Sequence, residues 1–223
     1  MIMGDIMKIN YKYFKKYKDR ADYLIKGIYA GMMIGIGGIA FLSLENKIAG
    51  SFFFSIGLLC VCMYGMNLYT GKIGYILNNK LSYLWELCLG LVGNFIGAYA
   101  VGRVMLLTRF KDSLVTKALT VSNLKLNDNL LSIFILSMFC GMLIYIAVNN
   151  YKKINNEIGK YFPIFLCVMV FILCGFEHCV ANMLYFTVAQ VWTWKTLLYV
   201  LIMVLGNSVG SIIIAWFYNL YYK

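Results

Sequence analysis

The sequence predicts an all-α membrane protein whose six transmembrane helices form two inverted three-helix repeats. Apolar residues make up 62% of the chain, and its mean hydropathy is +0.76. Charged residues make up 13%, whereas a soluble domain has about 25%. Six apolar stretches are long enough to cross a bilayer, which takes about 20 helical residues. A Gly-Asn-x-x-Gly motif also occurs once in each half of the chain.

The six apolar stretches occupy nearly all of the chain after its basic N-terminal segment. They cover residues 22–45, 51–77, 82–107, 129–150, 161–190 and 193–221. The first is too long for the apolar core of a signal peptide and is not followed by a cleavage motif, so it is expected to be a span. Residues 21–223 are therefore expected to form one six-helix transmembrane domain.

Residues 1–20 are expected to form a basic amphipathic helix. Ile2, Ile6, Ile9, Tyr13 and Tyr17 recur at helical spacing, and lysines line the other faces. Such a helix lies on the anionic inner leaflet of a membrane, or it caps a pore from the cytoplasmic side.

The distribution of Lys and Arg predicts that both termini lie in the cytoplasm of a multi-pass cell-membrane protein. Twelve of the twenty basic residues fall on the side of the termini and seven on the other, with Lys26 assigned to neither. Five of the outer basic residues lie between the third and fourth spans: Arg103, Arg109, Lys111, Lys117 and Lys125. Two interpretations stay open, a solvated loop or a cluster that concentrates an anion at the outer mouth.

The seven cysteines all fall within the expected spans and form no CxxC pair or His/Cys cluster. They are expected to pack as small apolar residues, with no disulfide, metal site or cofactor.

The Gly-Asn motif indicates an internal repeat. Gly93-Asn94-Phe95-Ile96-Gly97-Ala98 matches Gly206-Asn207-Ser208-Val209-Gly210-Ser211 at an offset of 113 residues. With three spans in each half, the second copy must cross the membrane in the opposite direction. The glycines allow close helix packing, whereas Asn94 and Asn207 each need a polar partner or a polar lumen.

The second and fifth spans are each interrupted by polar or small residues. The interruptions lie at residues 65–72 and 175–178, and matching breaks in two halves point to a site near the bilayer midplane. The second break contains Glu177 and His178, the only histidine of the chain. Ionisable groups inside a bilayer are costly and mark a substrate or proton path. A satisfied core histidine in a soluble protein is the alternative, which the composition disfavours.

Three segments resemble the formate/nitrite transporter family. Residues 175–183, Gly-Phe-Glu-His-Cys-Val-Ala-Asn-Met, resemble its Gly-Phe/Tyr-Glu-His-Ser-x-Ala-Asn-Met element. Residues 205–210 resemble its sixth-span Leu-Gly-Asn element, and residues 68–71 its Leu-Phe-Thr-Gly/Ser loop. The resemblance covers nearly the whole chain. It implies an aquaporin-like protomer with broken second and fifth helices, a homopentamer, and one pore in each protomer.

The resemblance also implies two apolar constrictions that bracket His178. Phe54 and Phe171 would form the outer one, and Leu58, Leu68 and Tyr69 the inner one. An ordinary core role is the alternative for each of them.

The family's vestibule lysine lies sixteen residues before a position that is usually asparagine. That spacing here gives Lys125 and Gly141. The lysine matches, whereas the asparagine that would polarise the surroundings of the central histidine is missing.

The physical task implied by the resemblance is to carry an anion past an apolar constriction, where a bare charge is costly. Lys125 is expected to attract the anion through a field that salt screens. His178 shares or donates a proton, because imidazole changes charge near neutral pH. Glu177 would fix the loop, and Thr70 would bond His178 or the substrate. Asn94 and Asn207 would hold the repeat ends together.

The expected function is therefore a channel or transporter for a small monovalent anion of a weak acid, such as nitrite, hydrosulfide or formate, with possible proton coupling. The Thr70-Gly71 pair slightly favours nitrite or hydrosulfide. A neutral-solute or ammonia channel is the alternative, although it gains nothing from a basic outer loop. An enzyme is not expected, because one histidine and no Ser/His/Asp set are present. Lipid, a small anion and a proton are the expected partners, and nucleic acid is not.

Overall fold

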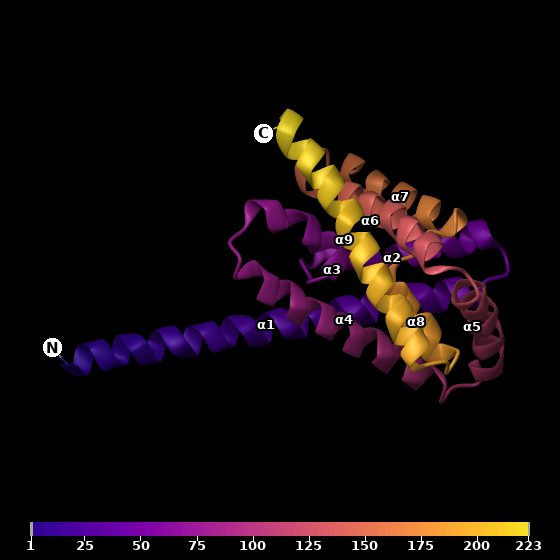
Figure 1. Ribbon diagram of the computed structural model, residues 1–223, viewed down its shortest axis with the longest axis horizontal. Coiled ribbons are helices and arrows are strands. Elements are labelled where there is room, and N and C mark those ends of the chain that lie inside the picture. Colours follow the sequence, from indigo (N-terminus) through magenta and orange to yellow (C-terminus); the bar gives the residue numbers. More distant parts are fainter. Residues whose placement is uncertain (1, 223) are drawn as a thin grey trace.

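The computed structural model describes residues 2–222, with side chains from residue 20 onward, and this part of the chain is helical without strands (Figure 1). The α-helices are α1 (Ile2–Ser43), α2 (Lys47–Met63), α3 (Tyr69–Lys72), α4 (Tyr83–Met105), α5 (Lys111–Leu126), α6 (Leu130–Lys153), α7 (Phe162–Leu173), α8 (Cys179–Val188) and α9 (Trp194–Tyr222). Two 3-10 helices cover Ile73–Asn78 and Gly159–Tyr161. The prediction of an all-α fold is confirmed.

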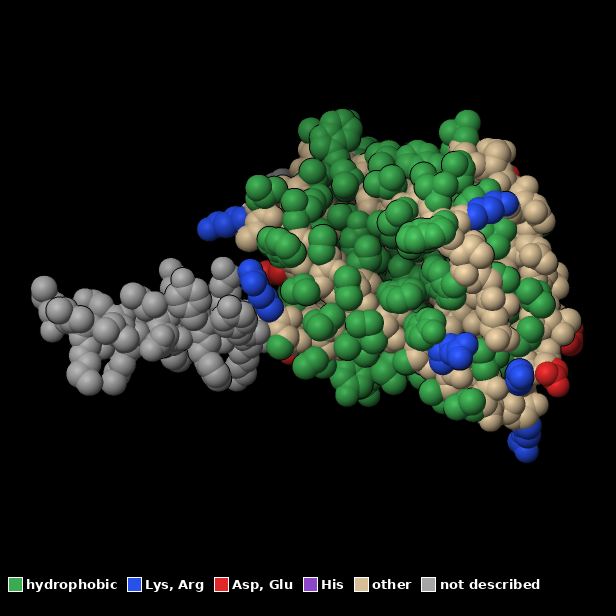
Figure 2. Space-filling model, turned by 60° about the horizontal axis from the view of Figure 1, so that its bottom comes forward, with side chains coloured by type: hydrophobic (Ala, Val, Ile, Leu, Met, Phe, Trp, Pro, Cys, Tyr) green, Lys and Arg blue, Asp and Glu red, His purple; other side chains and the backbone are tan. Residues whose placement is uncertain are grey.

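Within the part of the chain that the structure describes, four helices are long and apolar enough to cross a membrane. They are residues Arg20–Ser43 of α1, and α4, α6 and α9. Large apolar side chains such as Leu201 and Trp216 are exposed on α9. In Figure 2 hydrophobic side chains cover the middle of the visible face, and Lys and Arg lie mainly at its margins. Such a surface is stable only in lipid or against another protein, so the chain is a membrane protein.

The first helix is longer than its expected span. A surface helix over residues 1–20 and a separate span from residue 22 are expected, whereas α1 runs without interruption from Ile2 to Ser43. Its N-terminal part extends away from the other helices (Figure 1). The amphipathic pattern concerns side chains before residue 20, which lie outside the described side chains, so it stays a prediction.

Glycines allow two pairs of long helices to cross at close distance. The pairs are α1 with α4, and α6 with α9. A Cβ at Gly31 would overlap the backbone of Asn94, and a Cβ at Gly141 would overlap the backbone of Asn207. Small residues at such crossings let two backbones approach closely. Each Gly-Asn motif therefore sits where one long helix crosses another.

Two short loops share one conformation. Residues 64–68 separate α2 from α3, and residues 174–178 separate α7 from α8. Gly65 and Gly175 adopt φ values of 61° and 73°, which residues with a Cβ rarely adopt. The backbone bonds Met66 N to Val61 O (2.9 Å) and Phe176 N to Phe171 O (2.8 Å) recur at the same positions of the two loops.

The first non-helical stretch is shorter than the expected interruption over residues 65–72, because α3 already begins at Tyr69. Leu68, the residue before α3, is extended, as is His178 before α8. The two loops therefore end in the same way, each with one extended residue that precedes a short helix.

The basic segment between the third and fourth expected spans is a helix rather than a loop. Asp112 lies in the first turn of α5 and Lys125 in its last turn, where each complements the helix dipole. Lys117 forms an ion pair with Glu45, with 2.7 Å between Nζ and Oε1. The cluster is thus partly compensated by carboxylates from elsewhere in the chain.

Candidate functional site

Asn207 ties the loop before α8 to helix α6. Its Oδ1 accepts a hydrogen bond from Cys179 N at 2.9 Å, and its Nδ2 donates to Ser137 O at 2.8 Å and to Glu177 O at 2.7 Å. The side chain is fully buried, where an unpaired polar group would be costly. One asparagine thus satisfies the backbone on both sides of His178.

Asn94 does the same for the loop before α3. Its Oδ1 accepts from Tyr69 N at 2.8 Å, and its Nδ2 donates to Gly27 O at 2.8 Å and to Asn67 O at 2.9 Å. The residue held between the two loop contacts is Leu68. Leu68 therefore occupies in the first half of the chain the position that His178 occupies in the second.

His178 is 2% exposed and caps the N-terminus of α8. Its Nδ1 accepts the Ala181 N–H at 3.1 Å, and its Nε2 lies 2.9 Å from Thr70 Oγ1. A neutral imidazole has one donor and one acceptor nitrogen. Since Nδ1 is the acceptor, the proton is on Nε2, which donates it to Thr70.

This arrangement uses both ring nitrogens of His178. A second proton on Nδ1 would face the Ala181 N–H, so the ring could accept it only by giving up the cap of α8. Phe171 covers the ring in a stacked arrangement, with 5.7 Å between centroids. The neutral ring is the form that these contacts accommodate.

Glu177 forms a buried ion pair with Lys125 from α5. Lys125 Nζ donates to Oε1 at 2.8 Å and to Oε2 at 2.7 Å, and Asn182 Nδ2 donates to Oε2 at 2.8 Å. The Lys125 and Glu177 side chains are 10% and 4% exposed. The resemblance implies that Lys125 is the vestibule lysine, and in the structure its ammonium is buried against a carboxylate that compensates its charge.

Asn182 lies within the motif at residues 175–183, but the sequence alone assigns no role to it. Among the described groups, its Oδ1 is one of two buried side-chain atoms without a hydrogen-bond partner, the other being Ser122 Oγ. Its position five residues after Glu177 and one helical turn after His178 was the available signal. A buried free acceptor can receive a donor from a ligand.

A cavity of about 110 Å³, here named the Lys125 cavity, connects these groups. It is lined by Phe41, Lys47, Val121, Leu124, Lys125, Phe171, Ile172, Gly175, Phe176, His178, Ala181, Asn182 and Tyr185. Since one water takes roughly 30 Å³ of liquid volume, it holds a small ion and one or two waters. The imidazole lies in its wall.

The expected constriction residues are all buried. Phe54 packs edge-on against Phe171, with 5.7 Å between ring centroids. Leu58 and Leu68 are at most 1% exposed, and the Tyr69 hydroxyl bonds to Ser208 Oγ at 2.8 Å. The structure places Phe54, Phe171 and Leu68 close to the His178–Thr70 hydrogen bond.

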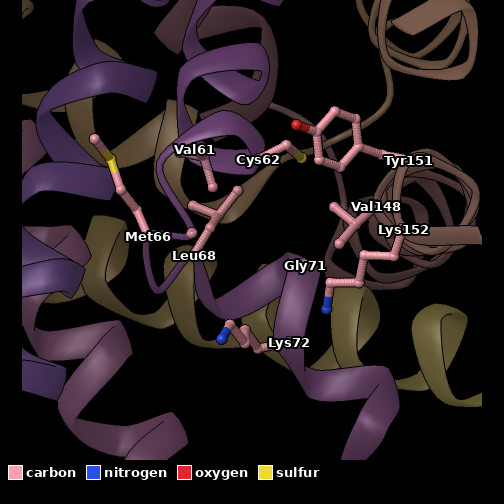
Figure 3. A pocket seen from close by; sticks show the side chains of 10 residues that line it. Val61, Cys62, Met66, Leu68, Gly71, Lys72, Val148, Tyr151 and Lys152 are labelled. Atoms are coloured by element: carbon pink, nitrogen blue, oxygen red, sulfur yellow. The ribbon is translucent and has the colours of Figure 1, made fainter. Parts of the chain in front are cut away.

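A second cavity, here named the Lys152 cavity, lies by the loop before α3. It measures about 80 Å³ and is lined by Val61, Cys62, Gly65, Met66, Leu68, Gly71, Lys72, Val148, Tyr151 and Lys152 (Figure 3). Leu68 and Gly71 in its wall flank the segment that carries Thr70. The Thr70–His178 hydrogen bond therefore lies between the two cavities.

Gly141 faces Asn207 rather than His178. Replacing it by alanine should force α6 and α9 apart, because the added Cβ would overlap the Asn207 carbonyl. We expect the variant to lose about 1–3 kcal/mol of stability, as overpacked sites do. Thermal unfolding of the purified protein in detergent measures the loss.

Gly90→Ala is the matched control for this substitution. A Cβ at Gly90 meets only Asn67 O at 3.6 Å, an ordinary contact. Equal unfolding temperatures for the two variants would contradict the close α6–α9 crossing.

The helical fold with its apolar surface, and a polar cluster buried between two small cavities, are those of a membrane transport protein. The sequence model of the family described as Formate/nitrite transporter matches residues 7–221. The chain belongs to the formate/nitrite transporter family, and the resemblance seen in its motifs is confirmed.

Individual relatives are distant. The chain is 26% identical over 202 residues to the formate-nitrite transporter of Plasmodium malariae, a match that covers 74% of this chain and 64% of the relative. It is 26% identical over 219 residues to the formate channel BtFdhC of Bacillus thuringiensis, covering 84% and 82%. A solved pentameric formate channel with formate bound superposes with a TM-score of 0.80 at 24% identity, covering 92% of this chain and 99% of that one.

Proposed function

We propose that the protein is a channel that passes a small monovalent anion of a weak acid, such as nitrite, hydrosulfide or formate, together with a proton. The observation that carries this proposal is the pair of cavities on either side of the His178–Thr70 hydrogen bond, each lined by lysines. Buried apolar residues lie between them. Two ion-sized basic chambers joined through an apolar barrier suit a charged solute better than a neutral one.

The chain crosses the membrane six times in this proposal. The passages are α1, α2 with α3, α4, α6, α7 with α8, and α9, and the loops at residues 64–68 and 174–178 interrupt the second and fifth. The paired bonds of Asn94 and Asn207 support two inverted repeats. Both termini lie in the cytoplasm of a cell-membrane protein, with the basic segment over residues 1–20 at the inner leaflet.

The assembly is a homopentamer in this proposal, with one pore in each protomer. The superposition on a pentameric formate channel over 92% of this chain supports it. The exposed apolar surface of α4 and α9 is available for neighbouring protomers or lipid.

The anion reaches the Lys125 cavity from outside and takes up a proton there before it meets Phe54 and Phe171. A neutral acid crosses an apolar barrier at far lower cost than its anion. The unpaired Asn182 Oδ1 supports this order, because it can accept a hydrogen bond from an acid O–H or S–H and not from a bare anion. Glu177 compensates the Lys125 ammonium, so that this lysine does not hold the solute in its anionic form.

His178 and Thr70 orient the acid instead of supplying its proton. The only N–H of the ring is on Nε2, and losing it would leave an imidazolate. The proton therefore comes from solvent in the cavity, and the Nε2–H bond to Thr70 frees the threonine hydroxyl hydrogen to point at the solute.

His178→Asn tests this role. Asparagine is a good N-cap residue, so α8 keeps its cap, whereas the shorter side chain cannot reach Thr70. We expect a normally assembled protein whose anion flux falls about tenfold, as loss of one hydrogen bond worth 1.4 kcal/mol would give. The dependence of flux on pH should stay as in the unmodified protein, because the proton comes from solvent. Flux of formate, nitrite and hydrosulfide into proteoliposomes at acidic and neutral pH measures both.

Thr70→Val is the companion variant, because it removes the hydroxyl and keeps the imidazole. It should lower flux by a similar factor. An unaltered flux in His178→Asn would make the histidine structural, and an altered pH profile would show that it titrates. Flux of ammonia without any anion flux in the unmodified protein would favour the neutral-solute alternative.

A further inference from the structure

The Lys152 cavity contains two lysines without a carboxylate partner. Lys72 is the last residue of α3, and Lys152 lies in the last turn of α6. The ion pairs among the described side chains involve Lys26, Lys117 and Lys125, and neither cavity lysine is among them. Glu86 acts on Lys72 electrostatically but is not within ion-pair distance. The two positive charges at this cavity are thus uncompensated by direct contact.

Both lysines line the cavity. In Figure 3 the nitrogens of Lys72 and Lys152 both lie lower in the view than Val61 and Val148. Aromatic rings hold both chains: Lys152 Nζ lies 4.2 Å from the Tyr75 ring centroid and Lys72 Nζ lies 5.7 Å from that of Tyr23. Lys152 acts on Lys72 as a like charge. Two cations held in this way favour an anion that both can contact.

The cavity limits what this anion can be. Its volume of about 80 Å³ equals that of two or three waters at roughly 30 Å³ each. A nucleotide or a sugar phosphate is too large, whereas a small oxyanion fits. Two ammonium groups favour two negative charges over one.

The Lys125 cavity differs in this respect. Its lining contains Lys47 and Lys125, and Lys125 is held by both oxygens of Glu177, at 2.8 and 2.7 Å. The charge of Lys125 is therefore compensated by direct contact, whereas neither lysine of the Lys152 cavity has such a carboxylate among the described side chains.

We propose that Lys72 and Lys152 form a binding site for a small divalent oxyanion, and that an anion bound there blocks the path from that side of the membrane. The blocking role rests on the proposed function, whereas the binding role does not. A divalent anion cannot continue past Leu68, because burying two charges in an apolar barrier costs far more than burying one. It occupies the cavity and excludes the permeating anion.

Binding is measured on purified protein in detergent by equilibrium dialysis with labelled sulfate, at constant ionic strength. Lys72→Gln and Lys152→Gln should each weaken sulfate binding about tenfold, as loss of one charged hydrogen bond of about 1.4 kcal/mol gives. Lys72→Arg should retain binding, which separates a lost charge from a misfolded protein. Lys153→Gln is the matched control, because Lys153 is the next residue in the same helical turn and, unlike Lys152, does not line the cavity.

Block is measured in proteoliposomes with sulfate on one side only. Sulfate on the side of the Lys152 cavity should reduce formate or nitrite flux, and sulfate on the other side should not. The block should weaken about tenfold in Lys72→Gln, in step with binding.

The outcomes separate the two proposals. Sulfate binding that is absent, or unchanged by both glutamine variants, overturns the site even where anion flux is normal. Binding that follows Lys72 and Lys152 in a protein without anion flux supports the site and overturns the proposed function. Equal block from both sides overturns the blocking role.

Discussion

Lys125→Met should destabilise the protein by about 3–5 kcal/mol and abolish anion flux at every salt concentration. The substitution keeps much of the side-chain volume and removes the ammonium. Glu177 would then be a buried carboxylate whose one described side-chain donor is Asn182, since Lys125 supplies the two other bonds. Unfolding temperature in detergent and flux in proteoliposomes measure the two effects.

The double variant Lys125→Met with Glu177→Gln separates charge from packing. It removes both charges, so most of the stability should return, whereas flux should not. If the loss of flux in Lys125→Met alone became smaller as the salt concentration was raised, Lys125 would instead act through solvent. Salt screens such a field over a Debye length of about 10 Å at 0.1 M. Lys117→Ala is the control, because its partner Glu45 is 91% exposed, and little loss of stability is expected.

Asn207→Ala should have the second largest effect. It leaves Cys179 N, Ser137 O and Glu177 O without their partner in a fully buried position. Each unsatisfied buried group costs about 1–3 kcal/mol, so the loss of stability should be several times that of an ordinary surface substitution. Chemical or thermal unfolding in detergent measures it.

Asn94→Ala should behave in the same way, because Asn94 makes the equivalent three bonds. Ser208→Ala is the neighbouring control, since its half-buried hydroxyl bonds only Val204 O and the Tyr69 hydroxyl. If the Asn207 and Ser208 variants unfolded at the same temperature, the asparagine would not hold the loop as described.

The long helices could be predicted closely from hydropathy. The stretch expected over residues 129–150 is α6 (Leu130–Lys153), and that over residues 193–221 is α9 (Trp194–Tyr222). Helix α5 was missed, because its sequence is polar and carries none of the apolar run that identifies a span. The start of α3 was missed as well, because the bond that fixes it comes from Asn94, 25 residues away.

Part of the candidate site could also be anticipated. The Thr70–His178 contact was one of two alternatives stated for the threonine, and the structure forms it. The partner of Lys125 was not anticipated, because Glu177 lies 52 residues further along the chain. The Lys152 cavity was missed for the same reason, since α3 and α6 supply its lysines from separate parts of the sequence.

Leu68 and His178 occupy equivalent positions in the two halves of the chain, and their different side chains make the two ends of the proposed pore chemically different. Two loops of one conformation, each fixed by its own asparagine, present a hydrocarbon in one copy and a hydrogen-bonding ring in the other. The backbone alone would therefore treat the two faces of the membrane alike. In the proposed pore, a solute that enters from one face meets the polar residue first, and a solute from the other face meets the oily one. The polarity of such a pore changes along its length through two side chains, although the backbone is the same in both halves.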